Sequence, residues 1–512
     1  MLYPSALTID IGHGEYWYGG CVADGVEMPF GRESDYSRSL LVNPTGNQAA
    51  PLLFSSQGRY IWCKEGFAYT FGGGRLTVSA PGGNLHFYDG FGDLRGAYRQ
   101  AARKHFTGGG KTPPELFFTA PQYNTWIELM YRQNQRDILA YAQNIVDKGM
   151  PVGVLMIDCG WAEYNGCMEF HSGRFPDPAG MIAWLHSKGF RVMLWESPFV
   201  TADSVVYRQL AGKGYLVRGA DGEPAIKHWW DGYSAVLDMT NPGARDWLRE
   251  QNAALMDKYG VDGFKMDAGD ARYYSTDDRT YAPVTPNEHC ELWARFGLSY
   301  DYNEYRACFK CSGEPLVQRL SDKCHSWESN GLRSLIPNIL AQGILGYPYG
   351  CPDMIGGGEY MNFLENSSHL DEELVVRYAQ CSALLPMMQF SAAPWRILGE
   401  ENFRLCREAA RLHVQYGGRI YQLAREAAEG GDPIVRYMEY VFPHQGLAQV
   451  TDQFMLGEDI LVAPVLEKNT DGRLVRFPAG NWQGADGEHI AGPCSRRVPA
   501  GPGTLPVFTR EE

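Results

Sequence analysis

An alternation of short apolar runs with amphipathic segments, beginning near residue 115, most constrains the fold of this chain. The runs that predict buried strands are 116–119, 153–158, 190–196, 234–238 and 263–266. The segments that predict helices are 132–148, 179–188 and 244–259. Alternating strands and helices are typical of a parallel sheet. The fold class we expect is therefore α/β, with a (β/α)8 TIM barrel at its centre.

Polar and aromatic residues stand where three of the predicted strands end. They are Asp158, the pair Trp195-Glu196, and Lys265 with Asp267. In a barrel these strand ends face the active site, so Asp267 is a candidate nucleophile or base. Lys265, two residues earlier, points to the same side of its strand and favours the ionised carboxylate. The alternative is that Asp267 only caps the turn that follows.

Hydrolysis of a glycosidic bond needs a second carboxyl group, one that carries a proton near neutral pH. The residues alone do not choose among the candidates, which are Asp158, Glu196, Asp270, Asp322 and Asp353. The identity of the second group stays open at this point.

Composition argues against several classes of partner. A net charge of −14, from 60 acidic and 46 basic residues, disfavours nucleic acid and anionic membrane. We find no run of about 18 apolar residues and no secretory signal, so we expect a cytoplasmic protein with reduced cysteines. The single pair Cys308 and Cys311 lacks the second pair of a structural zinc site, so we expect no metal.

Three domains are expected along the chain. Residues 1–114 predict an N-terminal β-rich, sandwich-like domain, 115–435 the catalytic barrel, and 436–512 a small C-terminal β-sheet domain. Within the barrel, 283–435 is expected to be mostly helical. The aromatic loop 15–20 is expected to be core or domain interface.

Four stretches, in order, resemble motifs of glycoside hydrolase family 31, the retaining α-glycosidases. They are Ile157–Trp161 with Arg174–Pro178, Lys265–Asp270, Leu332–Leu340 with Pro352–Gly357, and Gly457–Val465. The resemblance runs from about 115 to 480. Further stretches, among them Trp229-Trp230 and Arg319–Asp322 upstream of Trp327, resemble the branch of that family to which bacterial α-galactosidases belong.

The resemblance implies residue roles. Asp267 would be the nucleophile and Asp322 the acid/base, while Arg306 would hold sugar hydroxyls. The other residues implied to bind substrate are Asp158, Trp161, Trp195, Trp230, Lys265 and Trp327. Two departures from the family pattern stand out. Ser321-Asp322-Lys323 replaces a Gly-Asp-Asn-like triplet, and Asp270 replaces a glutamate.

The implied function is a retaining exo-α-glycosidase that uses two carboxylates in a double displacement and needs no cofactor. The resemblance leans towards a terminal α-galactoside, with α-glucoside or α-xyloside next. Transglycosylation would use the same residues. The alternative from another class is a sugar-binding barrel that has lost catalysis. The expected partner is an α-linked oligosaccharide or glycoside, and a homo-oligomer is compatible with the sequence.

Overall fold

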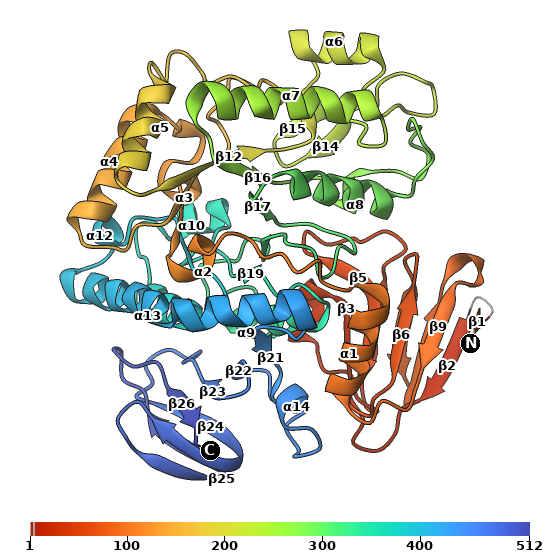
Figure 1. The fold of residues 1–512 in the computed structure, drawn as a ribbon, viewed down its shortest axis with the longest axis vertical. Coiled ribbons are helices and arrows are strands. Elements are labelled where there is room, and N and C mark those ends of the chain that lie inside the picture. Colours follow the sequence, from red (N-terminus) through yellow and green to blue (C-terminus); the bar gives the residue numbers. More distant parts are fainter. Residues whose placement is uncertain (1, 4–5, 512) are drawn as a thin grey trace.

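A computed structural model describes residues 2–3 and 6–511 of the protein. Two N-terminal antiparallel sheets, a central barrel and a C-terminal antiparallel sheet follow one another along the chain (Figure 1). The expected fold class is confirmed by the eight-stranded parallel sheet at the centre. Within the described residues, no helix is both long enough and apolar enough to cross a membrane.

The N-terminal part contains two antiparallel sheets. The five-stranded sheet has the order β1 (Leu2–Tyr3), β9 (Leu85–Tyr88), β6 (Tyr60–Cys63), β5 (Ala49–Ser55) and β3 (Trp17–Cys21). The four-stranded sheet has the order β2 (Ala6–Asp10), β8 (Arg75–Ser79), β7 (Ala68–Gly72) and β4 (Tyr36–Ser39). The aromatic segment predicted as core forms β3, where Trp17 and Tyr18 have no exposed surface. Helix α1 (Leu94–His105), which we did not predict, follows these sheets.

The barrel strands follow one another around the sheet in chain order. They are β10 (Gln122–Asn124), β11 (Val154–Ile157), β12 (Arg191–Glu196), β16 (Gly263–Met266), β17 (Tyr302–Tyr305), β18 (Gln318–Arg319), β19 (Gly350–Cys351) and β20 (Gln389–Phe390). Each is parallel to its neighbour, and β20 returns to pair with β10. Because β19 and β20 do not pair, the barrel is nearly closed.

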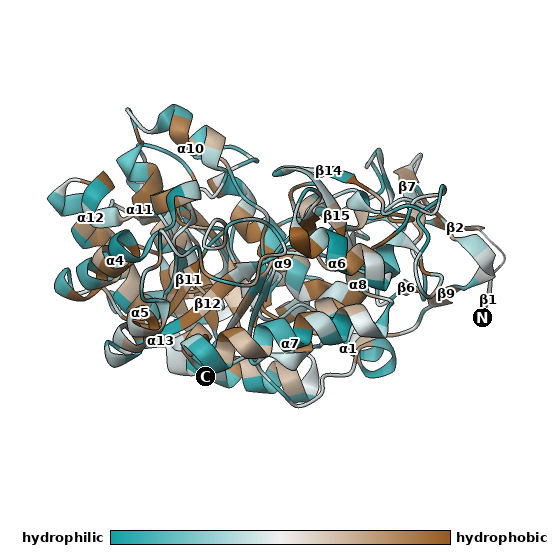
Figure 2. Cartoon of the chain, turned by 90° about the horizontal axis from the view of Figure 1, so that it is seen from above, coloured by the Kyte–Doolittle hydropathy of each residue, from teal (hydrophilic) through white to brown (hydrophobic). Residues whose placement is uncertain are grey.

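Helices pack outside the strands. They are α2 (Leu116–Thr119), α3 (Trp126–Leu129), α4 (Gln135–Asp147), α5 (Pro178–Ser187), α6 (Val205–Lys213), α7 (Pro242–Tyr259), α8 (Pro286–Phe296), α9 (Leu335–Ile344), α10 (Tyr360–Asn366), α11 (Glu372–Ala383), α12 (Pro394–Ile397) and α13 (Glu400–Gly430). Short 3-10 turns are η1 (Val22–Val26), η2 (Pro81–Gly83), η3 (Met130–Arg132), η4 (Ala271–Tyr273), η5 (Gly297–Ser299) and η6 (Leu332–Ser334). In Figure 2 the hydrophobic colour concentrates on β11 and β12, whose residues are almost all buried, whereas α7 presents mixed faces.

Local sequence explains where the helix before β16 ends and where β16, the strand that precedes Asp267, begins. The side chain of Asn241 caps α7, and Gly260, with φ +81°, ends it in the left-handed conformation. The chain then enters β16 at Gly263, where a Cβ would lie 1.9 Å from the carbonyl oxygen of Tyr302. Only glycine lets β16 lie this close to β17, so the turn predicted from the glycines sets the register of the strand.

Two sequence predictions were wrong in detail, and a third was incomplete. Residues 116–119 form helix α2, and the first barrel strand lies just after it. Residues 232–236 form β15 (Gly232–Val236), which pairs with β13 (Phe199–Thr201) and β14 (Lys227–Trp229) in a side sheet. The range 283–435, predicted to be mostly helical, contains helices α8 to α13 and also four barrel strands that were not predicted. They were missed because they are only two to four residues long and carry charged, inward-facing side chains such as Glu304 and Arg319.

The C-terminal sheet is antiparallel and has its own small core. Its order is β21 (Val435–Arg436), β22 (Phe454–Leu456), β23 (Ile460–Val462), β26 (Val507–Arg510), β24 (Gly472–Gly484) and β25 (His489–Pro499), and α14 (Met438–Val441) packs beside it. Trp482 is completely buried in this core. The β structure expected at this end of the chain is therefore present.

Helix α13 contacts α2 through Gly417. A Cβ at Gly417 would lie 2.7 Å from the Cα of Thr119, whereas a Cβ at Gly418 would have no atom within 4 Å. Alanine at these two neighbouring positions should therefore change the stability of the protein in opposite directions.

We expect Gly417→Ala to lower the unfolding midpoint, because overpacking a close helix contact costs about 1–3 kcal/mol. Gly418→Ala should raise it, because alanine is more stable than glycine in a helix by about 0.5–1 kcal/mol. Urea unfolding followed by circular dichroism measures both. Equal shifts of the same sign would contradict the contact between α13 and α2.

Candidate active site

Asp267 follows β16 at the mouth of the barrel, and both of its carboxylate oxygens are hydrogen-bonded. Trp195, on the neighbouring strand β12, donates its indole N–H to Oδ2 at 3.0 Å. Oδ1 accepts from Nε of Arg306 at 3.0 Å and from the backbone N–H of Ala268 at 2.8 Å. The carboxylate is therefore held in one orientation, with 8% of the residue exposed.

The surroundings of Asp267 keep it ionised. Burial raises the pKa of this carboxyl group, but the positive charges of Arg306 and Lys265 lower it more. Arg319 and the indole of Trp195 lower the pKa further, and the net value lies well below the usual range for aspartate. At neutral pH the group is an anion, the form that a nucleophile requires.

A second ion pair forms the base of the site. Nζ of Lys265 lies 2.7 Å from Oδ2 of Asp158, which follows β11, and both side chains are at most 4% exposed. Burial lowers the pKa of Lys265, but the charge of Asp158 raises it more, and the net pKa lies above the usual value. The pair offers donors and acceptors side by side in the way that a hydroxyl-rich ligand needs.

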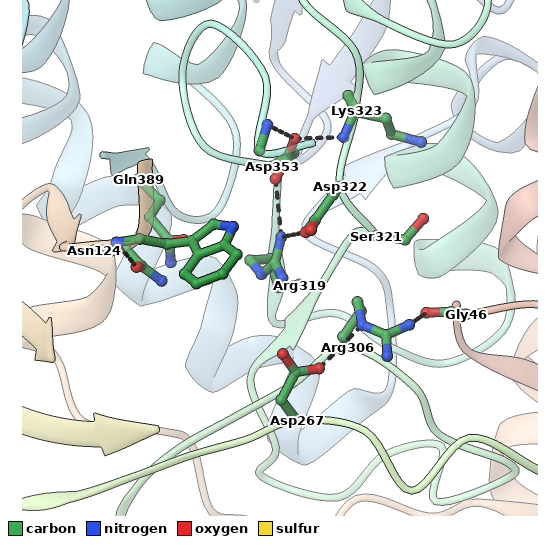
Figure 3. Close-up of polar contacts among 12 residues, drawn as sticks. Gly46, Asn124, Asp267, Arg306, Arg319, Ser321, Asp322, Lys323, Asp353 and Gln389 are labelled. Carbon is green, nitrogen blue, oxygen red and sulfur yellow. Dashed lines mark hydrogen bonds and ion pairs between the residues drawn. The ribbon is translucent and has the colours of Figure 1, made fainter. Parts of the chain in front are cut away.

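Arg306 connects Asp267 to two other parts of the chain. Its NH2 donates to Oδ1 of Asp270 at 2.8 Å. Its NH1 donates to the carbonyl of Gly46 at 2.7 Å (Figure 3). Asp270 is completely buried, and its short side chain still reaches the guanidinium, as the 2.8 Å bond shows. Arg306 was expected to hold sugar hydroxyls. In the structure its Nε binds Asp267, and its two terminal nitrogens bind Asp270 and Gly46.

Asp322 approaches from the loop after β18 and is the more accessible carboxylate, with 37% of its side chain exposed. Its Oδ1 accepts from NH1 of Arg319 at 2.8 Å (Figure 3). The following residue, Lys323, turns away, and its Nζ donates to Asn338 at 2.9 Å. The unusual Ser-Asp-Lys triplet therefore leaves the Asp322 carboxyl group free to meet a ligand.

One cavity of about 310 Å³ collects most of the predicted residues. Those that line it are Asp158, Trp195, Trp230, Lys265, Asp267, Arg306 and Asp322. Trp161 lies in the adjoining cavity and donates its indole N–H to the carbonyl of Trp195 at 2.8 Å. Trp327 does not line either cavity, because its indole N–H is directed at Asp371, 2.9 Å away.

Several lining residues were not predicted from the sequence. They are Gly46, Trp126, Cys159, Arg272, Arg319, Ser321, Met354, Glu359 and Tyr360. Trp230, in the turn between β14 and β15, and Tyr360, on α10, reach the cavity from elements that rise on the same side of the barrel (Figure 2). Glu196, one of the open candidates, points elsewhere and accepts from Asn252 on α7 at 3.0 Å.

Three consecutive residues of the N-terminal part contact Arg306, Arg319 and Ser321, which lie next to the carboxylates of Asp267 and Asp322. Gly46 binds Arg306, as described above. Asn47 exchanges two hydrogen bonds of 2.8 Å with Ser321, the residue before Asp322. Gln48 donates to the carbonyls of Arg306 and Arg319, at 2.6 and 2.8 Å. The N-terminal part thus completes the site, which no local motif indicated.

Among the described residues, no group of three or more His, Cys, Asp or Glu side chains is placed to hold a metal ion. Two of the carboxylates that line the cavity differ in their surroundings, because Asp267 is a buried anion and Asp322 is partly exposed. That arrangement suits a displacement at a carbon atom with acid assistance to the leaving group.

Family models agree with this geometry. Residues 112–423 match the TIM-barrel domain of glycosyl hydrolase family 31, and residues 431–512 match its C-terminal domain. The chain belongs to glycoside hydrolase family 31. The resemblance seen in the motifs is therefore confirmed.

Curated relatives span several named activities. The chain is 33% identical to the myogenesis-regulating glycosidase of Mus musculus over 407 residues, which cover 77% of this chain and 56% of that protein. It is 26% identical to alpha-glucosidase 2 of Bacillus thermoamyloliquefaciens, over 74% of this chain and 51% of the relative. The alpha-xylosidase XylQ of Lactiplantibacillus pentosus is 25% identical, over 86% of this chain and 59% of that protein. The chain spans about half the length of these relatives.

Solved structures share the fold. A family 31 dextranase of Flavobacterium johnsoniae, in complex with glucose, superposes with a TM-score of 0.84 at 19% identity, over 99% of this chain and 66% of that one. An alpha-xylosidase from a soil metagenome, in complex with xylose, gives a TM-score of 0.84 at 21% identity, over 99% of this chain and 79% of that one. At this level of identity the likeness concerns the fold.

The contact of Gly46 with Arg306 leads to a testable expectation. A Cβ at Gly46 would lie 2.3 Å from NH1 of Arg306, so Gly46→Ala must displace the guanidinium that orients Asp267. We expect glycoside hydrolysis to fall about 100-fold, because a misplacement of about 1 Å at a reacting group costs that much. Gly418→Ala, far from the cavity, is the control. Full activity of Gly46→Ala, with an unchanged melting temperature, would show that Arg306 does not orient the site.

Proposed function

We propose that the chain is a retaining exo-α-glycosidase that removes a terminal α-linked sugar. The observation that carries this proposal is the pairing, in one cavity, of a buried anionic Asp267 with the more exposed Asp322. A retaining mechanism requires such a pair at a separation of about 5–5.5 Å, one group as nucleophile and the other as acid and then base.

In the first step, Asp267 attacks the anomeric carbon and forms a glycosyl ester. The glycosidic bond breaks, and the leaving oxygen takes its proton from Asp322. In the second step, Asp322 removes a proton from water, the water oxygen attacks the same carbon, and the ester bond to Asp267 breaks. Arg306 and Trp195 hold Asp267 in line during both steps.

The depth of the cavity supports removal of a terminal unit. Asp158 and Lys265 close its base, and both are buried, whereas Asp322 is partly exposed near its opening. A sugar ring held against the base would direct its leaving group towards Asp322 and solvent.

The proposed sugar is galactose, and this preference rests on the resemblance of Trp229-Trp230 and Arg319–Asp322 to the α-galactosidase branch. The relatives named as alpha-glucosidase and alpha-xylosidase support the two alternatives. The proposed partner is accordingly an α-linked oligosaccharide or glycoside. The side chain of Lys323, held away at Asn338, argues against the alternative of an inactive sugar-binding barrel.

Hydrolysis of a panel of p-nitrophenyl α-glycosides tests this proposal, and we expect the wild type to cleave one member and to release the α-anomer first. Asp267→Asn should lower kcat at least 1,000-fold yet still bind the sugar in calorimetry, because the anionic nucleophile is removed while the cavity keeps its shape.

A matched control is Glu196→Gln, another carboxyl group at the end of a barrel strand. Its side chain is buried and points to Asn252, and burial raises its pKa to about 8, so glutamine resembles the form present at neutral pH. It should keep near wild-type activity. Initial release of the β-anomer, or an active Asp267→Asn, would overturn the proposed mechanism.

A further inference from the structure

Asp353 anchors the loop that carries Asp322 without lining the catalytic cavity. It follows β19, and none of its surface is exposed. Its Oδ2 accepts the backbone N–H of Lys323 at 2.6 Å and that of Gly358 at 2.7 Å. The first of these bonds fixes the backbone immediately after Asp322, so one end of the loop is tied to a buried carboxylate.

The same carboxylate reaches the side chain of Asp322 through Arg319. NH1 of Arg319 donates to Oδ1 of Asp353 and to Oδ1 of Asp322, at 2.8 Å in each case (Figure 3). Arg319 is 1% exposed and lies at the end of β18. Asp353 therefore holds both the backbone beside Asp322 and the guanidinium against which the Asp322 carboxyl group rests.

We propose that Asp353 is a positioning residue for acid catalysis, acting on Asp322 through Arg319 and through the N–H of Lys323. This proposal rests on the proposed function, in which Asp322 protonates the leaving oxygen. Proton transfer requires a hydrogen-bonded geometry of about 2.6–3.2 Å, which two anchor points secure better than one.

Asp353 and Asp322 share one cation, because NH1 of Arg319 donates to an oxygen of each. Burial and the charge of Asp322 raise the pKa of Asp353 well above its usual range, as expected when two acids compete for one cation.

The dependence of the rate on the leaving group separates this role from a merely structural one. A glycoside with a good leaving group, such as 2-chloro-4-nitrophenol, departs without a proton and needs no acid. Unsubstituted phenol is a poor leaving group and does need one. Loss of acid catalysis therefore lowers kcat/KM for the phenyl glycoside selectively, whereas general damage to the site lowers both.

The experiment compares kcat/KM for these two α-glycosides, made from the sugar that the wild type hydrolyses. For Asp353→Asn we expect a fall of at least 10-fold for the phenyl glycoside beyond any fall for the activated one. Asp322→Ala should show the same selectivity, at about 100-fold or more, since acid catalysis contributes about 10²–10⁴.

Glu304→Gln is the matched control. Glu304 is buried and lies 3.5 Å from Nε of Arg319, on the side away from Asp322, so its removal changes the charge beside the same arginine and leaves both anchors in place. The ratio of the two rates should stay that of the wild type. If Glu304→Gln changes the ratio as much as Asp353→Asn does, the effect is general electrostatics and the positioning role is wrong.

The experiment distinguishes failure of the acid role of Asp322 from failure of the positioning role of Asp353. Equal losses for both substrates in Asp322→Ala would overturn the acid role of Asp322 itself. A selective loss in Asp322→Ala, together with equal losses in Asp353→Asn, would overturn only the role of Asp353. Should Asp353→Asn not fold, Arg319→Lys gives the same comparison, because an ammonium keeps the charge but not the shared NH1 group. An unchanged ratio there also contradicts the proposal.

Discussion

The ion pair between Asp267 and Arg306 is the interaction on which the rest of the structure depends. Removing a carboxylate and a guanidinium from water is costly unless each finds further partners. Arg306 obtains them from Asp270 and Gly46, and Asp267 from Trp195 and a backbone N–H. The barrel supplies the strand ends that carry these groups. The N-terminal part supplies the carbonyl oxygen that completes the set.

This dependence explains why the N-terminal sheets and the barrel form one catalytic unit. The segment Gly46–Gln48 contacts Arg306, which binds Asp267, and Ser321, which precedes Asp322, so it links the positions of the two carboxylates. The N-terminal sheets and the barrel share one hydrophobic core, so a separation fixed between them is held by close packing. In the proposed mechanism, the more exposed carboxylate, Asp322, meets the leaving group while Asp267 stays held by its own partners.

The sequence predicted the part of the site that follows the buried strands β11, β12 and β16. Asp267 follows a strand bounded by glycine turns, and Lys265 shares its face, so local pattern and family motif agreed. Arg319 was missed because its strand has only two residues, too few for any periodicity. The contact of Gly46 with Arg306 could not be predicted from the sequence for another reason. It contacts Arg306 across 260 positions of the chain, and a glycine carbonyl bears no chemical signature. Trp327 matched a motif, yet it is directed at Asp371.

The central claim is that Asp267 forms the covalent bond to the sugar, and a trapped intermediate tests it most directly. The protein would be incubated with the 5-fluoro α-glycosyl fluoride of the sugar it cleaves, digested with trypsin and analysed by mass spectrometry. Cleavage after Lys265 and Arg272 yields the peptide Met266–Arg272. We predict one glycosyl adduct on this peptide, and fragmentation should place it on Asp267. An adduct on Asp270 or on another peptide, or turnover with no adduct and first release of the β-anomer, would contradict the account.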